Sequence, residues 1–159
     1  MRVLFVCHGN ICRSTMAEFI MRKMVADAGM SDSIEVESAG TSDEELGSPV
    51  YPGTKRILDA MGIDCSKKRA RQATRDDYEK FDLIVGMDRI NLLNTRRICK
   101  GDPRNKIKRL LDFTDSPRDI ADPWYHGDFD ATKELVVEGC RALLDYLRDA
   151  NAQSPRDAT

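Results

Sequence analysis

A cysteine and an arginine lie six positions apart near the start of the chain, in a segment whose residue types are suited to phosphoryl transfer. The segment reads Cys7-His8-Gly9-Asn10-Ile11-Cys12-Arg13-Ser14. A cysteine thiolate is a strong nucleophile, and the planar guanidinium of arginine donates paired hydrogen bonds to phosphate oxygens. We therefore expect Cys7 to attack phosphorus and Arg13 to hold the phosphate group.

The residues on either side of this segment predict its place in the fold. An apolar run at residues 3–6 precedes it, and apolar residues at helical spacing follow from Ser14. A loop between a strand and a helix directs backbone N–H groups toward one point, where the helix dipole also favours an anion. The loop should therefore surround a bound phosphate, with Cys7 facing it from the end of the strand.

Two other interpretations of the segment fit its residues less well. Nucleotide-binding loops also lie between a strand and a helix, but this loop has a single glycine, Gly9, and lacks both G-x-G-x-x-G and G-K-[ST]. Alternatively, Cys7 is an ordinary core cysteine and Arg13 a surface charge. The position of C-x₅-R-S directly after an apolar run, at the start of a helix, favours catalysis.

Attack on a phosphate ester expels an oxygen anion, so the reaction needs a general acid, and later a base that activates water. The best candidate for both is Asp122, because Pro123 stiffens its loop and two aromatic residues follow. Trp124 and Tyr125 are expected to form one wall of a pocket. Asp102 also precedes a proline, but no aromatic residue follows it, so we expect it to belong to an ordinary turn.

Four apolar runs alternate with helical patterns along the chain. The predicted strands are residues 3–6, 34–38, 83–85 and 107–111, the main predicted helices are residues 14–28, 51–61, 89–99 and 130–151, and residues 112–128 are predicted to form a long irregular loop. Strands that alternate with helices pair in parallel through right-handed crossovers. We expect an α/β fold with a doubly wound sheet of four parallel strands and flanking helices. Ligands bind beyond the carboxyl ends of such strands, which is where Cys7 lies.

The length and composition indicate one globular domain. We expect residues 1–151 to form this domain and residues 152–159 to form a disordered tail. With 41% hydrophobic and 33% charged residues the chain is typical of a soluble protein, and its net charge of −2 gives no sign of nucleic-acid binding. No apolar run approaches the ~20 residues of a membrane span.

The cysteines and the start of the chain predict a reducing compartment. The five cysteines are an odd number without an extracellular pattern, and Met1-Arg2 leads into an apolar run without a signal-peptide pattern. We therefore expect the protein to be cytoplasmic. No C-x₂-C pair is present and His8 has no partner cluster, so we expect no metal site and no other cofactor.

The segment around Cys7 resembles the signature of the low-molecular-weight protein tyrosine phosphatases, V-C-x-G-N-I-C-R-S-P. Thr15 stands at the position of the final proline, and His8 stands where the family often has leucine. The resemblance extends to about residue 150 and includes an acidic loop of the pattern D-P-[WYF]-Y, here residues 122–125. It implies a flavodoxin-like fold, with residues 1–151 as a single phosphatase domain.

The resemblance also implies a reaction and its partners. Members of this family hydrolyse phosphotyrosine and small aryl phosphates by double displacement, in which Cys7 would form a phosphocysteine, Arg13 would hold the phosphate, and Asp122 would be first acid and then base. No metal ion takes part. The expected partners are phosphotyrosine proteins, with phosphate and oxyanions such as vanadate as inhibitors, and neither nucleic acid nor a membrane is expected.

Further site residues follow from the same resemblance. Asn10 matches the asparagine that holds the strained turn of the phosphate loop, Ser38 matches its hydrogen-bond partner, and Ser14 matches a hydroxyl that stabilises the thiolate. Ordinary roles for these residues, as turn asparagine, strand-end serine and helix cap, are compatible with these functions. The expected substrate-binding residues are His8, Gly9, Asn10, Ile11, Cys12, Ser14, Glu44, Trp124 and Tyr125.

Two features of the predicted pocket have alternative interpretations. Asp43, Glu44 and Glu45 stand where many family members carry a bulky aromatic residue, so they either form an acidic rim or are only a solvated loop. Cys12 lies in the same tight loop as Cys7. Mild oxidation is therefore expected to join the two in a disulfide, unless Cys12 is merely small and buried.

Two rival functions are open at this point. A thiol-dependent arsenate reductase would share the fold and the loop, but it needs two further cysteines close together, and residues 85–91 contain none while Cys99 stands alone. A catalytically silent phosphate-binding module would not need Cys7, Arg13 and Asp122 together. Turnover of para-nitrophenyl phosphate without metal distinguishes an enzyme from such a module.

Overall fold

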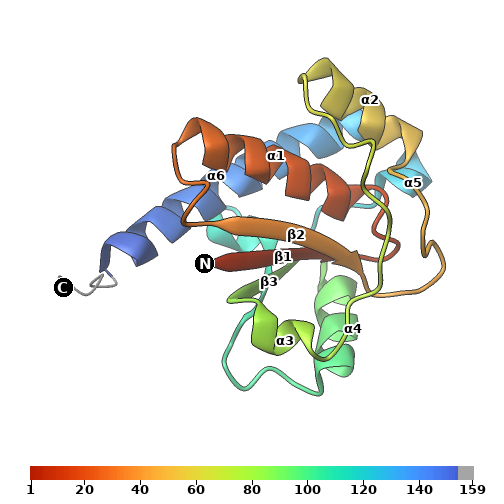
Figure 1. The fold of residues 1–159 in the computed structure, drawn as a ribbon. Helices are drawn as coiled ribbons and strands as arrows, with labels where there is room; N and C mark the ends of the chain where they lie inside the picture. The colour runs from red at the N-terminus through yellow and green to blue at the C-terminus, as the bar shows by residue number, and fades with distance from the viewer. Residues whose placement is uncertain (154–159) are drawn as a thin grey trace.

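The centre of the molecule is a parallel sheet of four strands that lies between two layers of helices (Figure 1). The computed structural model describes residues 1–153. The strands are β1 (Arg2–Cys7), β2 (Glu35–Gly40), β3 (Leu83–Gly86) and β4 (Ile107–Arg109), in the spatial order β2-β1-β3-β4. Every neighbouring pair is parallel, which confirms the prediction made from the alternating strand and helix patterns.

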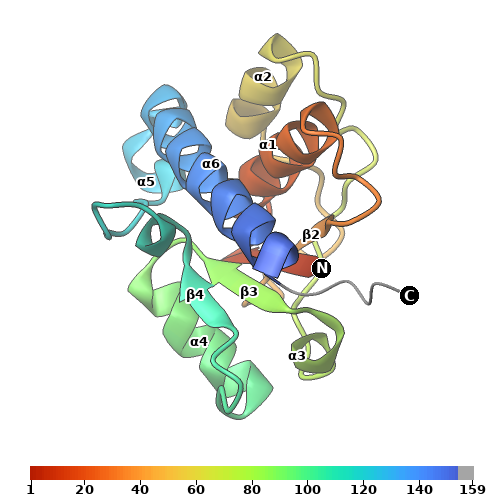
Figure 2. The ribbon, with the colours of Figure 1, turned by 90° about the vertical axis from the view of Figure 1, so that its left-hand side faces the viewer.

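Helices cover both faces of this sheet. They are α1 (Arg13–Asp27), α2 (Pro52–Ala60), α3 (Asp77–Lys80), α4 (Arg89–Cys99), α5 (Pro123–His126) and α6 (Phe129–Gln153). Figures 1 and 2 show α1, α2 and α6 on one side of the sheet and α3 and α4 on the other. The fold is therefore the flavodoxin-like, doubly wound α/β fold that was expected from the sequence.

Strand β1 lies inside the sheet and has Cys7 at its carboxyl end. It pairs with β2 on one side and with β3 on the other, and residues 3–6 are fully buried. Because helices cover both faces, every side chain of such a strand needs to be apolar, and the run shows no alternation. The chain continues from β1 to β2 on one side and later to β3 on the other, so a crevice opens beyond the end of β1. The loop after Cys7 lies at this crevice.

One difference from the predicted elements follows β4. The apolar pattern predicts a strand to residue 111, but β4 ends at Arg109 and a 3₁₀ turn, η1 (Leu110–Phe113), follows. The turn contacts α6 and buries Leu110 and Leu111 completely. Gly139 of α6 permits this packing, since a Cβ there would lie 2.5 Å from Leu110 Cγ. Tertiary packing therefore prevails over strand propensity here.

The segment predicted to be irregular, residues 112–128, also contains a short helix near its end. Helix α5 begins at Pro123, and Asp122 caps it by accepting a hydrogen bond from Trp124 N at 3.1 Å. Proline suits the first position of a helix, because its missing N–H would have no partner within the helix. The cap and the proline together fix the position of Asp122.

Helix α6 extends slightly beyond its predicted range of 130–151, from Phe129 to Gln153. Residues 152 and 153, which were expected in a tail, continue the helix, and the rest of that tail lies outside the described residues. The extent of the domain stays a prediction. Among the helices within residues 1–153, none has both the length and the apolar character needed to cross a membrane.

Candidate active site

The loop between β1 and α1 has a strained conformation centred on Asn10. This residue has a φ of 60°, in the left-handed region that asparagine tolerates better than most residues. Its Oδ1 accepts a hydrogen bond from Arg71 N at 3.1 Å, and its Nδ2 donates to Ser14 Oγ and Ser38 Oγ, each at 2.9 Å. The buried amide therefore stabilises the turn through three hydrogen bonds.

The sulfur of Cys7 lies at the start of this loop, close to the hydroxyl and the backbone N–H of Ser14. Ser14 Oγ is 3.0 Å from Cys7 Sγ, and Ser14 N is 3.4 Å from it. Since Ser14 Oγ already accepts a hydrogen bond from Asn10, its own proton can point at the sulfur. Hydrogen bonds to the charged form of a group favour that form, so this arrangement suits a thiolate.

The guanidinium of Arg13 is buried next to the loop and is oriented by two acceptors. Its Nη1 donates to Asp88 Oδ2 at 2.6 Å and to the carbonyl oxygen of Ile120 at 2.8 Å. Its Nε is buried and has no hydrogen-bond partner among the described residues. A buried donor without an acceptor is costly, so this N–H is well suited to an oxygen of a bound oxyanion.

Negative groups around Arg13 keep its side chain charged. Burial alone would lower the pKa of Arg13, but the negative charge of Cys7 and the hydrogen bond to Asp88 raise that pKa above its ordinary value. Asp122 Oδ2, which lies 3.6 Å from Arg13 Nη2, acts in the same direction. The site therefore has a permanent positive charge at the base of the loop.

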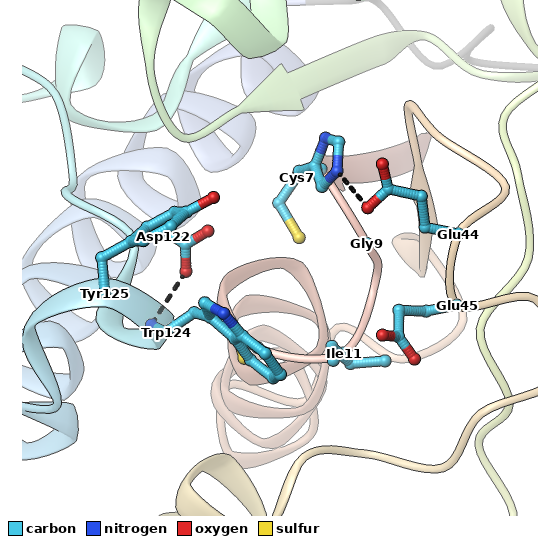
Figure 3. A pocket seen from close by; sticks show the side chains of 10 residues that line it. Cys7, Gly9, Ile11, Glu44, Glu45, Asp122, Trp124 and Tyr125 are labelled. Carbon is cyan, nitrogen blue, oxygen red and sulfur yellow. Dashed lines mark hydrogen bonds and ion pairs between the residues drawn. The ribbon is translucent and has the colours of Figure 1, made fainter.

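A single pocket brings most of the predicted site residues together (Figure 3). It is lined by Cys7, His8, Gly9, Ile11, Cys12, Glu44, Glu45, Asp122, Trp124 and Tyr125. In Figure 3 the sulfur of Cys7 points into the pocket, with Asp122 and Trp124 on one side and Glu44 and Glu45 on the other. A nucleophile and a carboxyl group therefore face the same space, although they are far apart in the sequence.

Two residues predicted to bind substrate lie elsewhere. Asn10 and Ser14 are buried and are not part of the pocket lining, because their polar groups are engaged with one another and with Ser38 and Cys7. Their position makes them supports of the loop. Ser38, predicted to be a supporting residue, lies in the same buried group.

The aromatic wall of the pocket depends on Tyr51, which no sequence pattern indicates. Its ring meets that of Trp124 edge-on, with 4.9 Å between the centroids, and stacks on Phe129 at 5.6 Å. Its backbone N–H donates to the carbonyl oxygen of Ile11 at 3.0 Å, which links the start of α2 to the phosphate loop. Such packing between distant segments leaves no local signal in the sequence.

Asp88 has two roles. Its Oδ1 accepts a hydrogen bond from Asn91 N at 2.7 Å and so caps α4, a role that an aspartate directly before a helix often has. Its Oδ2 holds Arg13. The order of the strands could have indicated this second role. Asp88 follows β3 and Arg13 follows β1, and the carboxyl ends of neighbouring parallel strands meet at one edge of a sheet.

The acidic rim is smaller than the sequence suggests. Glu44 and Glu45 line the pocket, whereas Asp43 is not part of the lining. Glu44 Oε2 lies 2.9 Å from His8 Nε2, and both side chains are largely exposed. Glu45 accepts a hydrogen bond from Ser48 at 2.9 Å. The rim therefore consists of two carboxylates, one of them next to an imidazole.

Asp102, the other aspartate that precedes a proline, belongs to a turn as expected. Its Oδ1 accepts hydrogen bonds from the Tyr78 hydroxyl and from Lys106 N, each at 2.7 Å. Its Oδ2 accepts one from Ile107 N at 3.1 Å. Both oxygens are therefore used to shape the entry to β4.

All five cysteines are free and buried. Burial and the negative charge of Cys7 raise the pKa of the Cys12 thiol, and burial raises the pKa of Cys140. Cys99 belongs to the hydrophobic cluster on the opposite face of the sheet from Cys7, so it does not form the neighbouring thiol pair that an arsenate reductase needs. Within residues 1–153, no group of three or more His, Cys, Asp or Glu side chains is arranged to hold a metal ion.

Comparison with known sequences identifies the family to which this loop and pocket belong. The family described as "Low molecular weight phosphotyrosine protein phosphatase" matches residues 2–153, nearly the whole chain. The chain belongs to this family. It is 40% identical over 148 residues to the low molecular weight protein-tyrosine-phosphatase YfkJ of Bacillus subtilis, covering 92% of this chain and 95% of YfkJ. The protein is therefore an enzyme of the phosphatase class of hydrolases.

Solved structures of low molecular weight phosphatases have the same fold. The crystal structure of YfkJ superposes with a TM-score of 0.91 at 38% identity, covering 94% of this chain and 96% of that one. The Streptococcus pyogenes phosphatase SP-PTP gives 0.82 at 39% identity, covering 92% of each chain. A Drosophila relative, DARP, gives 0.82 at 28% identity, covering 92% of this chain and 98% of its own, and is named an arginine phosphatase.

Proposed function

We propose that this phosphatase hydrolyses phosphotyrosine in proteins, and small aryl phosphates, through a phosphocysteine intermediate and without a metal ion. The observation that carries the proposal is the meeting of Cys7 and Asp122 in one pocket, with the guanidinium of Arg13 3.6 Å from Asp122. The buried Nε of Arg13 has no hydrogen-bond partner among the described residues. A nucleophile, a proton donor and a binder of anions are the groups that such a reaction needs.

In the first step, the Cys7 thiolate attacks phosphorus in line with the leaving oxygen. A bond forms between sulfur and phosphorus, and the bond from phosphorus to the tyrosine oxygen breaks. Arg13 and the N–H groups of the loop hold the three non-bridging oxygens. Asp122, in its protonated form, transfers its proton to the leaving oxygen, so tyrosine departs as a neutral phenol.

In the second step, Asp122 is a carboxylate and removes a proton from a water molecule as the water oxygen attacks phosphorus. The bond between sulfur and phosphorus breaks, inorganic phosphate leaves, and Cys7 returns to the thiolate form. The Ser14 hydroxyl stabilises that thiolate. Fixed dipoles and the charge of Arg13 supply the electrostatic stabilisation, which is why no metal ion is needed.

Phosphotyrosine is the substrate that fits the walls of the pocket best. Trp124 and Tyr125 offer flat apolar surface to an aromatic ring, and a serine side chain is too short to bring such a surface into contact. Because DARP is named an arginine phosphatase, phosphoarginine is the alternative that has to be compared. A tyrosine ring would cover more of Trp124 than the narrow stem of arginine does.

We also propose that the enzyme works in the cytoplasm on phosphotyrosine proteins. Five buried free thiols, including the nucleophile, are compatible with a reducing compartment. Phosphate, and oxyanions such as vanadate, would inhibit by occupying the loop as analogues of the phosphoryl group.

The test is a panel of substrates assayed with excess EDTA: a phosphotyrosine peptide, para-nitrophenyl phosphate, a phosphoserine peptide and a phosphoarginine peptide. We expect turnover of the first two, unchanged by EDTA, and rates at least about tenfold lower for the others. Such a factor corresponds roughly to the binding free energy that one well-packed aromatic ring contributes. Vanadate, tested without EDTA, should inhibit. Faster turnover of phosphoarginine would contradict the substrate assignment, and loss of activity that added metal restores would contradict metal independence.

A further inference from the structure

Glu18 of α1 carries a carboxylate that is almost fully buried, although it takes no part in the proposed reaction. The residue is 1% exposed. A buried charge is costly unless it is paired and hydrogen-bonded, and replacing such a group by an apolar one is often neutral. The groups that contact this carboxylate indicate why a charged side chain is present at position 18.

Three groups contact the Glu18 carboxylate. Arg22 Nη2 lies 2.7 Å from Oε2, and Lys68 Nζ lies 3.1 Å from Oε1. The hydroxyl of Ser38 donates to Oε1 at 2.5 Å. Lys68 Nζ also donates to the carbonyl oxygen of Ser38 at 2.9 Å, so one ammonium group holds both the carboxylate and strand β2.

The direction of each hydrogen bond can be followed from Asn10. A backbone N–H can only donate, so the bond from Arg71 N identifies the oxygen of the Asn10 amide, and the other atom is its nitrogen. That nitrogen donates to Ser38 Oγ and to Ser14 Oγ. Each hydroxyl oxygen therefore accepts one bond from Asn10 and has one proton left to donate.

The two remaining protons have defined acceptors. The Ser38 proton goes to Glu18, because an ionised carboxylate can only accept. When Cys7 is a thiolate its sulfur can only accept, so the Ser14 proton then goes to this sulfur, which lies 3.0 Å from Ser14 Oγ. The bonds thus form one buried network that connects a paired carboxylate at one end to the nucleophile at the other.

We propose that Glu18 and Lys68 are positioning residues for the phosphatase reaction: they hold Ser38, and through Asn10 they keep the Ser14 hydroxyl directed at Cys7. The proposal rests on the proposed function of Cys7 as the nucleophile. Neither residue lines the pocket that contains Cys7 and Asp122. Glu18 provides the acceptor that orients Ser38, and Lys68, whose side chain is 14% exposed, balances its charge.

The neighbouring lysine provides a matched control. Lys67 is exposed and makes no hydrogen bond or ion pair among the described residues. Lys68→Met and Lys67→Met remove the same charge from adjacent positions, and only the first removes a contact with Glu18. Lys68→Arg keeps the charge and tests whether a cation at this position is sufficient.

The readout is the rate at which iodoacetate alkylates Cys7 as a function of pH, because only the thiolate reacts and turnover is not required. For Lys68→Met we expect this profile to move to higher pH by about half a unit to one unit, and kcat/KM to fall about five- to tenfold, as a weakened hydrogen bond to a charged sulfur implies. Lys68→Arg should recover most of both losses, and Lys67→Met should match the unmodified enzyme.

A double-mutant cycle tests the route through Ser38. Glu18→Gln alone should move the alkylation profile in the same direction as Lys68→Met. In a Ser38→Ala background it should have no further effect, because the bond that transmits the change is already absent. Thermal unfolding of each variant shows that the protein measured is folded.

An unchanged alkylation profile in folded Lys68→Met and Glu18→Gln variants would overturn the proposal. An equal effect of Glu18→Gln with and without Ser38 would also overturn it, since the effect on Cys7 would then not pass through the hydrogen bond between Glu18 and Ser38. Failure of the proposed function looks different: the unmodified protein would then show no phosphatase turnover, whereas the alkylation profile reports on the network in either case.

Discussion

At the scale of single residues, the surroundings of two similar aspartates give them different roles. Asp122 caps α5, lines the pocket and has Oδ2 3.6 Å from Arg13 Nη2. Asp102 is used in hydrogen bonds to Tyr78 and to two backbone N–H groups. Both precede a proline, so the dipeptide alone does not identify the proton donor.

Asp122→Ala should lower kcat by about 10²–10⁴-fold, the usual effect of losing a general acid and base. The loss should be larger for phenyl phosphate than for para-nitrophenyl phosphate, because a better leaving group needs less help from a proton. Asp102→Ala is the control. Its kcat should be nearly unchanged while the free energy of unfolding falls by about 1–3 kcal/mol, since several donors lose their acceptor. Equal losses of kcat in the two variants would show that the acid has been misassigned.

A second prediction at this scale concerns oxidation of Cys7. Peroxide converts its thiolate to a sulfenic acid, and attack by the Cys12 sulfur then forms a disulfide and releases water. Because burial raises the pKa of the Cys12 thiol, its thiolate is scarce at neutral pH and becomes more abundant as the pH rises. We expect the disulfide-linked peptide to increase, relative to Cys7 sulfonic acid, between about pH 6 and pH 9.

Peptide mapping after mild peroxide treatment measures this ratio. The Cys12→Ser variant should give no linked peptide and more sulfonic acid at every pH. A linked peptide that is absent, or that decreases as the pH rises, would mean that Cys12 does not protect the nucleophile.

At the scale of elements, the site is assembled where the carboxyl ends of β1 and β3 meet. Cys7 ends β1, and Asp88 follows β3 and holds Arg13 at 2.6 Å while it caps α4. The carbonyl oxygen of Ile120, in the loop that leads to α5, is the second acceptor for Arg13. Two segments that are distant in sequence from Arg13 therefore orient its guanidinium.

Two substitutions of Asp88 separate its roles. Asp88→Asn keeps an oxygen that can cap α4 but removes the charge, whereas Asp88→Ala removes both. Both should lower kcat/KM about tenfold, because Arg13 loses a charged partner that orients it. Only Asp88→Ala should lose the additional ~1 kcal/mol of stability typical of a missing helix cap. Steady-state kinetics and urea unfolding measure the two effects, and a normal kcat/KM for Asp88→Asn would exclude a role in orienting Arg13.

The elements could largely be predicted because they depend on local patterns. The apolar run of β1, the cap at Asp88 and the proline of α5 are each visible in a few consecutive residues. The contacts that complete the site join distant segments, as in the pair of Tyr51 and Trp124 and the pair of Glu18 and Lys68. No spacing along the chain encodes such pairs, and the 3₁₀ turn η1 likewise depends on how closely α6 approaches.

At the scale of the whole molecule, charge near the pocket is expected to influence which proteins are dephosphorylated. The chain has a net charge of −2, and two of its carboxylates, those of Glu44 and Glu45, lie at the rim of the pocket opposite the aromatic wall. Exposed charges act over roughly 10 Å at ordinary salt, which is enough to reach residues that flank a phosphotyrosine. The rim should therefore disfavour acidic flanks.

Matched phosphotyrosine peptides with basic and acidic flanks test this expectation. At low salt we expect kcat/KM to be several-fold higher for the basic peptide, with the difference shrinking at high salt as screening increases. Glu44→Gln and Glu45→Gln should each reduce the difference. Equal values for the two peptides at low salt would remove any role for the rim and would leave Glu44 and Glu45 as a solvated loop.

The proposed mechanism requires the phosphoryl group to reside on Cys7 during turnover. The most direct measurement is rapid quenching of the enzyme with para-nitrophenyl phosphate, followed by mass spectrometry of the peptide that contains Cys7. We predict a phosphoryl group on this cysteine in the steady state, and no turnover in a folded Cys7→Ser variant, since loss of a nucleophile costs several kcal/mol of barrier. Turnover by Cys7→Ser within about tenfold of the unmodified enzyme, or a phosphoryl group found on a different residue, would contradict the mechanism.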